Sequence, residues 1–90
     1  MEHFNIRVLG KVQGVFYRAN TRKKAYDLGI TGYVRNEPDG SVYIEAEGRL
    51  DKLNEFVSWC RTGPDRAKVD EVQVKSSGEL KNFTRFEIES

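Results

Sequence analysis

Two stretches with the spacing of an amphipathic helix divide this chain and limit the folds that it can adopt. In each stretch the apolar or small residues recur every three or four positions, so they line one face of a helix. The first set is Tyr17, Thr21, Ala25 and Leu28, and the second is Leu50, Leu53, Phe56, Val57 and Cys60. Gly29 suits the C-cap of the first helix, and Asp51 is placed to be the N-cap of the second.

The remaining apolar residues mostly alternate with polar ones, which is the pattern of β-strands. This alternation predicts strands over residues 4–8, 30–36 and 42–48, and shorter apolar pairs predict two more strands around Val72–Val74 and Phe86–Ile88. The segment Glu37–Gly40 predicts a tight turn, because Pro38 presets φ and Gly40 accepts a positive φ. In the third strand, Val42, Ile44 and Ala46 are expected to point inward. Outward-pointing side chains are expected at Ser41, Tyr43, Glu45 and Glu47.

The predicted order is strand, helix, strand, strand, helix, strand, with a further short edge strand. This is a split βαβ pattern, which predicts an α+β fold, a ferredoxin-like two-layer sandwich. Both helices are expected on one face of a largely antiparallel sheet, and residues 1–90 are expected to form a single domain. Many unrelated activities use this fold, so the fold alone does not define a function.

Composition excludes several classes of protein. The 90 residues carry 15 Lys and Arg against 14 Asp and Glu, a net charge of +1, which lacks the basic footprint of a dedicated nucleic-acid binder. No apolar run reaches the length of a transmembrane helix. One cysteine, Cys60, allows no intramolecular disulfide, and residues 1–5 lack the pattern of a signal peptide, so we expect a cytoplasmic, monomeric protein.

The segment Gly10–Arg18 joins a predicted strand to a predicted helix and has the composition of an anion-binding loop. Backbone N–H groups and the helix N-terminus favour an anion there, and Gly14 can adopt a positive φ. Arg18 in the first helical turn is normally disfavoured by the helix dipole, which points to an anion that joins it. Because the first two strands should be parallel, Asn36 is expected at the same end of the sheet, about 10 Å away if a third strand lies between.

Each of these features also has a plainer interpretation. The glycine loop can be an ordinary loop with a surface arginine, and Asn36 can serve only the turn that follows it. Val15–Tyr17 can either wall a site or pack under the helix. His3 is expected to be solvated near the chain terminus. Cys60 is expected to be a core residue.

The segments Val8–Arg18 (VLGKVQGVFYR) and Gly32–Val42 (GYVRNEPDGSV), with Gly48 after the second, resemble the two signatures of the acylphosphatase family. Tyr17 stands where that family usually has Phe or Met. The resemblance implies hydrolysis of a small acyl phosphate to a carboxylate and inorganic phosphate, with no cofactor and no metal. It implies that Arg18 binds the phosphoryl group and that Asn36 positions the attacking water. The phosphate oxygens would be held by the loop, namely Gln13, Gly14, Val15, Phe16, Tyr17 and Arg18.

The small set of polar residues agrees with that chemistry. A carboxylate leaves without a general acid, and phosphoryl transfer depends mainly on positioning and charge stabilisation. Two other hypotheses remain open from the sequence. Tyr33 and Tyr43 could stack RNA bases on the sheet, although the usual aromatic motif is absent. The chain could also bind an anion without turning it over.

Overall fold

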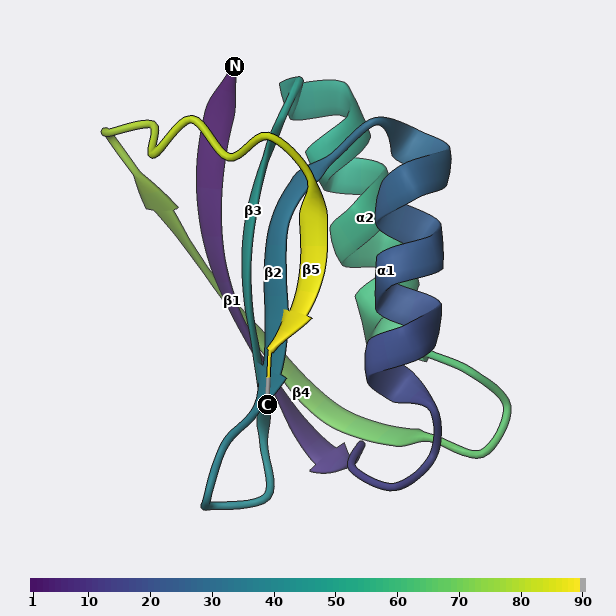
Figure 1. Cartoon of the computed structure of the whole chain (residues 1–90). Coiled ribbons are helices and arrows are strands. Elements are labelled where there is room, and N and C mark those ends of the chain that lie inside the picture. Colours follow the sequence, from purple (N-terminus) through teal and green to yellow (C-terminus); the bar gives the residue numbers. More distant parts are fainter. Residues whose placement is uncertain (90) are drawn as a thin grey trace.

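In the computed structural model, which describes residues 1–89, two helices cover one face of a five-stranded sheet (Figure 1). The strand order across the sheet is β4-β1-β3-β2-β5, and only the β2–β5 pair is parallel. The predicted ferredoxin-like sandwich is therefore confirmed, with β5 as the additional edge strand. The elements are β1 (Glu2–Lys11), α1 (Tyr17–Leu28), β2 (Thr31–Asn36), β3 (Val42–Gly48), α2 (Leu50–Thr62), β4 (Lys68–Ser77) and β5 (Phe86–Glu89).

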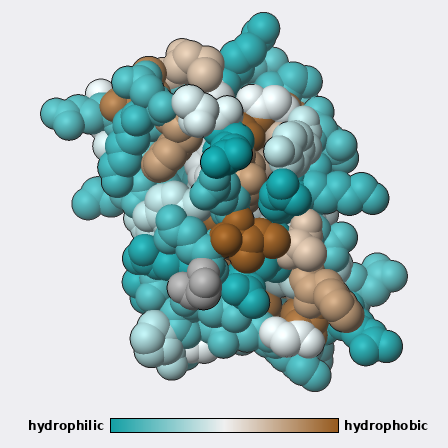
Figure 2. All heavy atoms as spheres, in the orientation of Figure 1, coloured by the Kyte–Doolittle hydropathy of each residue, from teal (hydrophilic) through white to brown (hydrophobic). Residues whose placement is uncertain are grey.

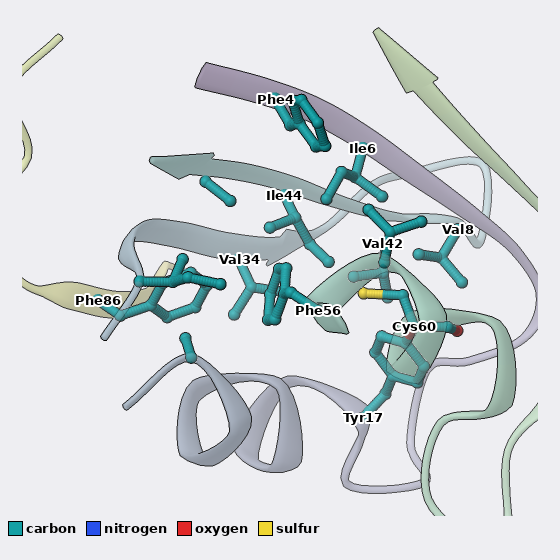
Figure 3. Packing of buried hydrophobic residues seen from close by; sticks show 14 of the residues in the cluster. Phe4, Ile6, Val8, Tyr17, Val34, Val42, Ile44, Phe56, Cys60 and Phe86 are labelled. Carbon is teal, nitrogen blue, oxygen red and sulfur yellow. The ribbon is translucent and has the colours of Figure 1, made fainter. Parts of the chain in front are cut away.

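The core lies between the sheet and the two helices, where the alternating residues of the strands meet the apolar stripes of α1 and α2 (Figure 3). Figure 3 shows strand residues pointing toward Phe56 and Cys60 of α2 and toward Tyr17 at the start of α1. Cys60 is fully buried, as predicted, and burial raises the pKa of its thiol to about 12. The strand residues of this core are Phe4, Ile6, Val8, Val34, Val42, Ile44, Ala46 and Phe86.

The predicted cap residue is confirmed for α1 and is wrong for α2. Gly29 ends α1 in the left-handed region, and its N–H bonds back to carbonyl groups of the last turn, as its position predicts. Asp51 is not the N-cap of α2, contrary to expectation. Leu50 already begins the helix, and the extended residue Arg49 is the cap, so Asp51 lies in the first turn, where a carboxylate suits the helix dipole.

On the face of the sheet away from the helices, residues 78–85 cross one end of the sheet between β4 and β5 (Figure 1). Glu47 points to this face, as predicted, but it is buried there and accepts hydrogen bonds from the backbone N–H groups of Lys81 and Phe83. Glu45 is buried beside it and pairs with the Lys81 ammonium group. The outward direction of these carboxylates was predicted correctly, whereas their burial was not.

The expectation of a solvated His3 is wrong. Its side chain is 1% exposed, its Nδ1 lies 2.6 Å from Glu47 Oε2, and its ring stacks on Phe83 at 6.0 Å between centroids. The terminus does not fray here because β1 begins at Glu2, and His3 pairs with Glu47 of β3 on one side and with Ser77 of β4 on the other.

Candidate functional site

The loop between β1 and α1 turns twice through the left-handed region of backbone conformation. Gly14 has φ 72°, and Phe16, the N-cap of α1, has φ 63° and ψ 21°. Within residues 1–89, no backbone carbonyl accepts a hydrogen bond from the N–H groups of residues 13–16. The first N–H groups of α1 likewise have no partner inside the helix. A run of unpaired N–H groups with left-handed turns is the geometry of an anion-binding nest.

The apolar run in this loop serves both of the roles left open by the sequence. Val15 and Tyr17 are buried and pack into the core, whereas Phe16 between them is 71% exposed. The Phe16 carbonyl accepts two hydrogen bonds from Asn20, one from its backbone N–H at 3.1 Å and one from its side-chain amide at 2.8 Å. These bonds fix the left-handed residue at the start of the helix.

Arg18 reaches from the first turn of α1 to the C-terminal end of β5. Its side chain is half-buried, and Nη1 donates a hydrogen bond to the Glu89 carbonyl at 3.2 Å. Glu89 is paired in register with Arg35 of β2, the residue before Asn36. The parallel pairing of β5 with β2 therefore brings the guanidinium group to the end of the sheet at which β2 stops.

Asn36 is the last residue of β2, and its side-chain oxygen has an unusual environment. Oδ1 is buried and has no hydrogen-bond partner among the described residues. An unsatisfied buried acceptor costs about 1–3 kcal/mol, and such a group in a folded protein points to a catalytic role or to a bound molecule that completes it. β1 and β2 are both antiparallel to β3, which lies between them, as expected.

Gln13 connects the loop to the turn that follows Asn36. Its side-chain amide donates to the carbonyl oxygens of Glu37 and Ser41, each at 2.8 Å. The same turn is closed by the Glu37 N–H bonded to the Ser41 carbonyl, and by Asp39 accepting from the Ser41 hydroxyl and N–H. The hydroxyl and N–H of Ser41 also lower the pKa of Asp39. The Gln13 side chain thus fixes the distance between the two halves of the site.

These parts enclose a pocket of about 310 Å³. Of the predicted site residues, the structure brings Gly14, Phe16, Tyr17, Arg18 and Asn36 together around it. Gln13 and Val15 do not line the pocket, because the Gln13 side chain bonds to the turn and Val15 packs in the core. In Figure 2 hydrophobic atoms gather beside hydrophilic ones where β5 ends near the start of α1. The pocket is lined by Val12, Gly14, Phe16, Tyr17, Arg18, Ala19, Asn36 and Ile88.

Tyr17 is one of the residues at this pocket, but its hydroxyl group is used elsewhere. The hydroxyl donates to the Cys60 carbonyl at 2.8 Å, inside the core, and the ring lies 5.5 Å from that of Trp59. Burial, followed by the proximity of Cys60, raises the pKa of the Tyr17 hydroxyl far above its usual value. The hydroxyl that sets this residue apart from Phe or Met is therefore used to join α1 to α2.

Two residues of the site escaped the sequence reasoning. Ile88 was expected only as part of a short strand, and Asn20 carried no expectation. Phe86 and Ile88 lie on the same face of β5, but Phe86 is buried under α1 whereas Ile88 is at the pocket. Only the register of β5 on β2, with Ile88 opposite Val34, places Ile88 there, and no local pattern encodes that register.

The aromatic residues on the outer face of the sheet are already engaged. The Tyr33 and Tyr43 hydroxyls both donate to Glu45, and the Arg35 guanidinium lies over both rings, 5.6 Å and 4.9 Å from their centroids. Burial and the bonds to Glu45 raise the pKa of Tyr43 to about 12. A stacking platform for RNA bases needs open ring faces, so this arrangement disfavours the RNA-binding hypothesis.

Among residues 1–89, no group of three or more His, Cys, Asp or Glu side chains is arranged to hold a metal ion. No helix in the same part of the chain is both long and apolar enough to span a membrane.

The fold and the loop define a small ferredoxin-like domain with a pocket at one end of its sheet, lined by residues of the β1–α1 loop, Arg18 and Asn36. The acylphosphatase family model matches residues 4–88. An acylphosphatase of Marinobacter nauticus is 49% identical over 96% of this chain and 94% of its own length. The crystal structure of an acylphosphatase from Bacillus subtilis superposes with a TM-score of 0.98 at 36% identity and covers both chains completely. An acylphosphatase from Coxiella burnetii gives 0.94 at 34% identity, over 98% of this chain and 92% of its own. The chain belongs to the acylphosphatase family.

Proposed function

We propose that this chain hydrolyses the carboxyl–phosphate bond of a small acyl phosphate, using Arg18 and the loop amides to hold the phosphoryl group and Asn36 to position the water. The observation that carries this proposal is the meeting of three complementary groups at one pocket. These are unpaired backbone N–H groups, a half-buried guanidinium and an unpaired buried amide oxygen. Each of them gains a partner when a phosphoryl group and a water molecule enter.

Arg18 is suited to bind the phosphoryl oxygens because its planar guanidinium can donate two parallel hydrogen bonds. The bond from Nη1 to the Glu89 carbonyl fixes one edge of the group and leaves other N–H donors for the substrate. No acidic residue lies in the first turn of α1 to neutralise the arginine or compete for it. The loop N–H groups and the helix N-terminus add donors on the other side of the same anion.

Asn36 cannot act as a Brønsted base, but its amide oxygen can accept a hydrogen from water. A water held by Oδ1 presents a lone pair to the phosphorus atom, opposite the departing carboxylate. Positioning of this kind lowers the entropic part of the barrier. The proton of the attacking water passes to a phosphoryl oxygen or to solvent, since the leaving carboxylate needs no protonation.

The decisive experiment separates phosphate binding from turnover. Purified protein is assayed for hydrolysis of acetyl phosphate without added metal, and isothermal titration calorimetry with inorganic phosphate measures binding directly. Arg18→Ala and Arg18→Lys are expected to lose both turnover and phosphate binding. Asn36→Ala is expected to lose turnover and to retain phosphate binding.

Arg49→Ala and Asn54→Ala are matched controls, because both residues are exposed at the start of α2, away from the pocket, and neither should change turnover. Turnover no faster than the buffer blank, or turnover that is insensitive to Asn36→Ala, would contradict the proposal. Phosphate binding by a protein that turns over no acyl phosphate would instead favour the non-catalytic anion-binding hypothesis.

We further propose that the chain works as one domain, as a monomer and in the cytoplasm. The support is its size, the single free buried cysteine and the pocket, which is built from this chain alone. Light scattering after size exclusion at working concentration tests the monomer, for which a mass near 10.4 kDa is expected. Fractionation of source cells tests the location.

A further inference from the structure

Two large apolar side chains lie exposed at the pocket. Phe16 is 71% exposed and Ile88 is 43% exposed, and they come from different elements, the loop before α1 and the edge strand β5. The other exposed large apolar residues of the described chain do not line this pocket. Exposed apolar surface that gathers at a pocket marks a place of binding.

The side chain of Phe16 is exposed because of the backbone conformation of this residue. A left-handed conformation is unfavourable for a residue with a side chain, and a glycine at the same position would avoid that cost. The two hydrogen bonds from Asn20 to the Phe16 carbonyl hold the residue in this conformation. The same φ sends the benzyl group away from the core, into which Val15 and Tyr17 on either side are packed.

A phosphoryl group held by the loop amides and Arg18 leaves its acyl group to extend past Phe16 and Ile88. Val12 and Ala19 add apolar residues to the lining of the same pocket. An acetyl group offers a single methyl group to such a lining, whereas an aromatic or branched acyl group offers more apolar surface to cover exposed side chains. We propose that Phe16 and Ile88 form an acyl-binding rim that makes the enzyme select acyl phosphates with a bulky apolar acyl group. This inference rests on the proposed acylphosphatase reaction.

The first test compares kcat/KM for benzoyl phosphate and acetyl phosphate in the native protein and in Phe16→Ala. Loss of an aromatic contact is expected to lower kcat/KM for benzoyl phosphate about tenfold more than kcat/KM for acetyl phosphate, so the ratio of the two reports the contact. Ile88→Ala, at an exposed edge position, is expected to change the ratio in the same direction by about threefold. Leu50→Ala is the matched control, since Leu50 is an exposed apolar residue at the start of α2, and the ratio should not change.

The second test measures binding without turnover. Phenylphosphonate should bind more tightly than methylphosphonate to the native protein, and Phe16→Ala and Ile88→Ala should each reduce that difference. Equal losses for both acyl phosphates, or for both phosphonates, would show that Phe16 acts through the loop and would overturn the inference. An unchanged ratio in both variants would overturn it too.

The two experiments distinguish failure of the proposed acylphosphatase reaction from failure of the proposed acyl-binding rim. In the first case the native protein turns over neither substrate, and the preference between the two phosphonates still reports on the rim. In the second case the native protein is active and shows no preference that depends on Phe16 or Ile88.

Discussion

Removal of the Tyr17 hydroxyl should destabilise the protein at neutral pH and leave its activity almost unchanged. The hydroxyl donates to the carbonyl of Cys60 in the last turn of α2. That carbonyl has no helical partner, because the residue four positions later is Pro64, which has no N–H group. Tyr17→Phe leaves this buried acceptor unsatisfied, and we expect a loss of about 1–2 kcal/mol in the free energy of unfolding.

The size of this loss should depend on pH in a way that identifies the hydroxyl. Burial raises the pKa of Tyr17 in the folded protein far above the value of about 10 that it has when unfolded. The stability contributed by a raised pKa is fully present below the unfolded pKa and is lost as pH rises above it. At about pH 11 the native protein should lose about 1.4 kcal/mol from this residue, while the phenylalanine variant loses nothing. The difference between the two proteins should therefore shrink from about 1–2 kcal/mol to near zero.

Urea unfolding followed by the fluorescence of Trp59, the single tryptophan, measures both quantities at about pH 7 and about pH 11. The remaining tyrosines titrate in both proteins, so their effects cancel in the difference, whereas Cys60 is coupled to Tyr17, and both proteins are therefore compared in a Cys60→Ala background. Tyr26→Phe, at an exposed position on α1, is the matched control and should change stability little at either pH. A difference that stays constant or widens at about pH 11 would refute the reasoning. A severe loss of kcat/KM for acetyl phosphate at neutral pH would refute the assignment of the hydroxyl to the core.

Three further outcomes follow from contacts in the structure. Gly63→Ala should cost more than about 2 kcal/mol in urea unfolding, because an added Cβ would lie 2.7 Å from the Tyr17 ring at a residue with φ +66°. Burial alone would raise the pKa of Glu45, but hydrogen bonds from Lys81 and two tyrosine hydroxyls lower it to about 2. The contribution of Glu45 to the free energy of unfolding is therefore present above about pH 4.5 and lost as pH falls toward 2. Urea unfolding of Glu45→Gln should accordingly show an acid dependence weaker by about 2 kcal/mol, a value reduced for the exposure of Lys81. Gln13→Ala should lower kcat about tenfold with little change in far-UV circular dichroism, because it frees the loop from the turn after β2; an unchanged kcat would remove Gln13 from the positioning of the site.

The sequence was sufficient to predict the helix-facing half of the fold. The alternation of Phe4, Ile6 and Val8, and the helical spacing of Tyr17, Thr21 and Ala25, are local patterns, and the structure places them in the expected elements. The other face of the sheet was not predictable in the same way. The burial of Glu47 there depends on residues 78–85, which have no period and are held by long-range hydrogen bonds such as those that the backbone N–H groups of Lys81 and Phe83 donate to Glu47. His3 was misjudged because its carboxylate partner Glu47 and its stacking partner Phe83 lie more than forty residues away in the chain.

The residues of the candidate site likewise fall into those that the sequence predicts and those that it does not. Gly14 and Arg18 follow from a glycine loop before a helix, and Asn36 follows from the topology that makes the first two strands parallel. Phe16 does not follow, because an apolar residue between two apolar neighbours carries no sign of a positive φ. Its conformation results from two constraints that act together: Val15 and Tyr17 must both be buried, and α1 must begin immediately after Phe16.

Three features that disfavour folding lie together at this pocket, and the proposed anionic ligand would offset two of them. A left-handed phenylalanine and a buried unpaired amide oxygen each disfavour folding by about 1 kcal/mol or more, and an arginine in the first turn of a helix adds about 0.3–1 kcal/mol. A domain of this size has only about 5–15 kcal/mol of total stability, so selection for folding alone would favour a glycine, an acidic residue and a satisfied side chain at these positions. A phosphoryl group with its attacking water reverses the two electrostatic costs at once, since it supplies charge to Arg18 and a donor to Asn36. The proposed ligand therefore accounts for features of this pocket that the unliganded fold alone does not explain, as expected if binding and catalysis share the same few residues.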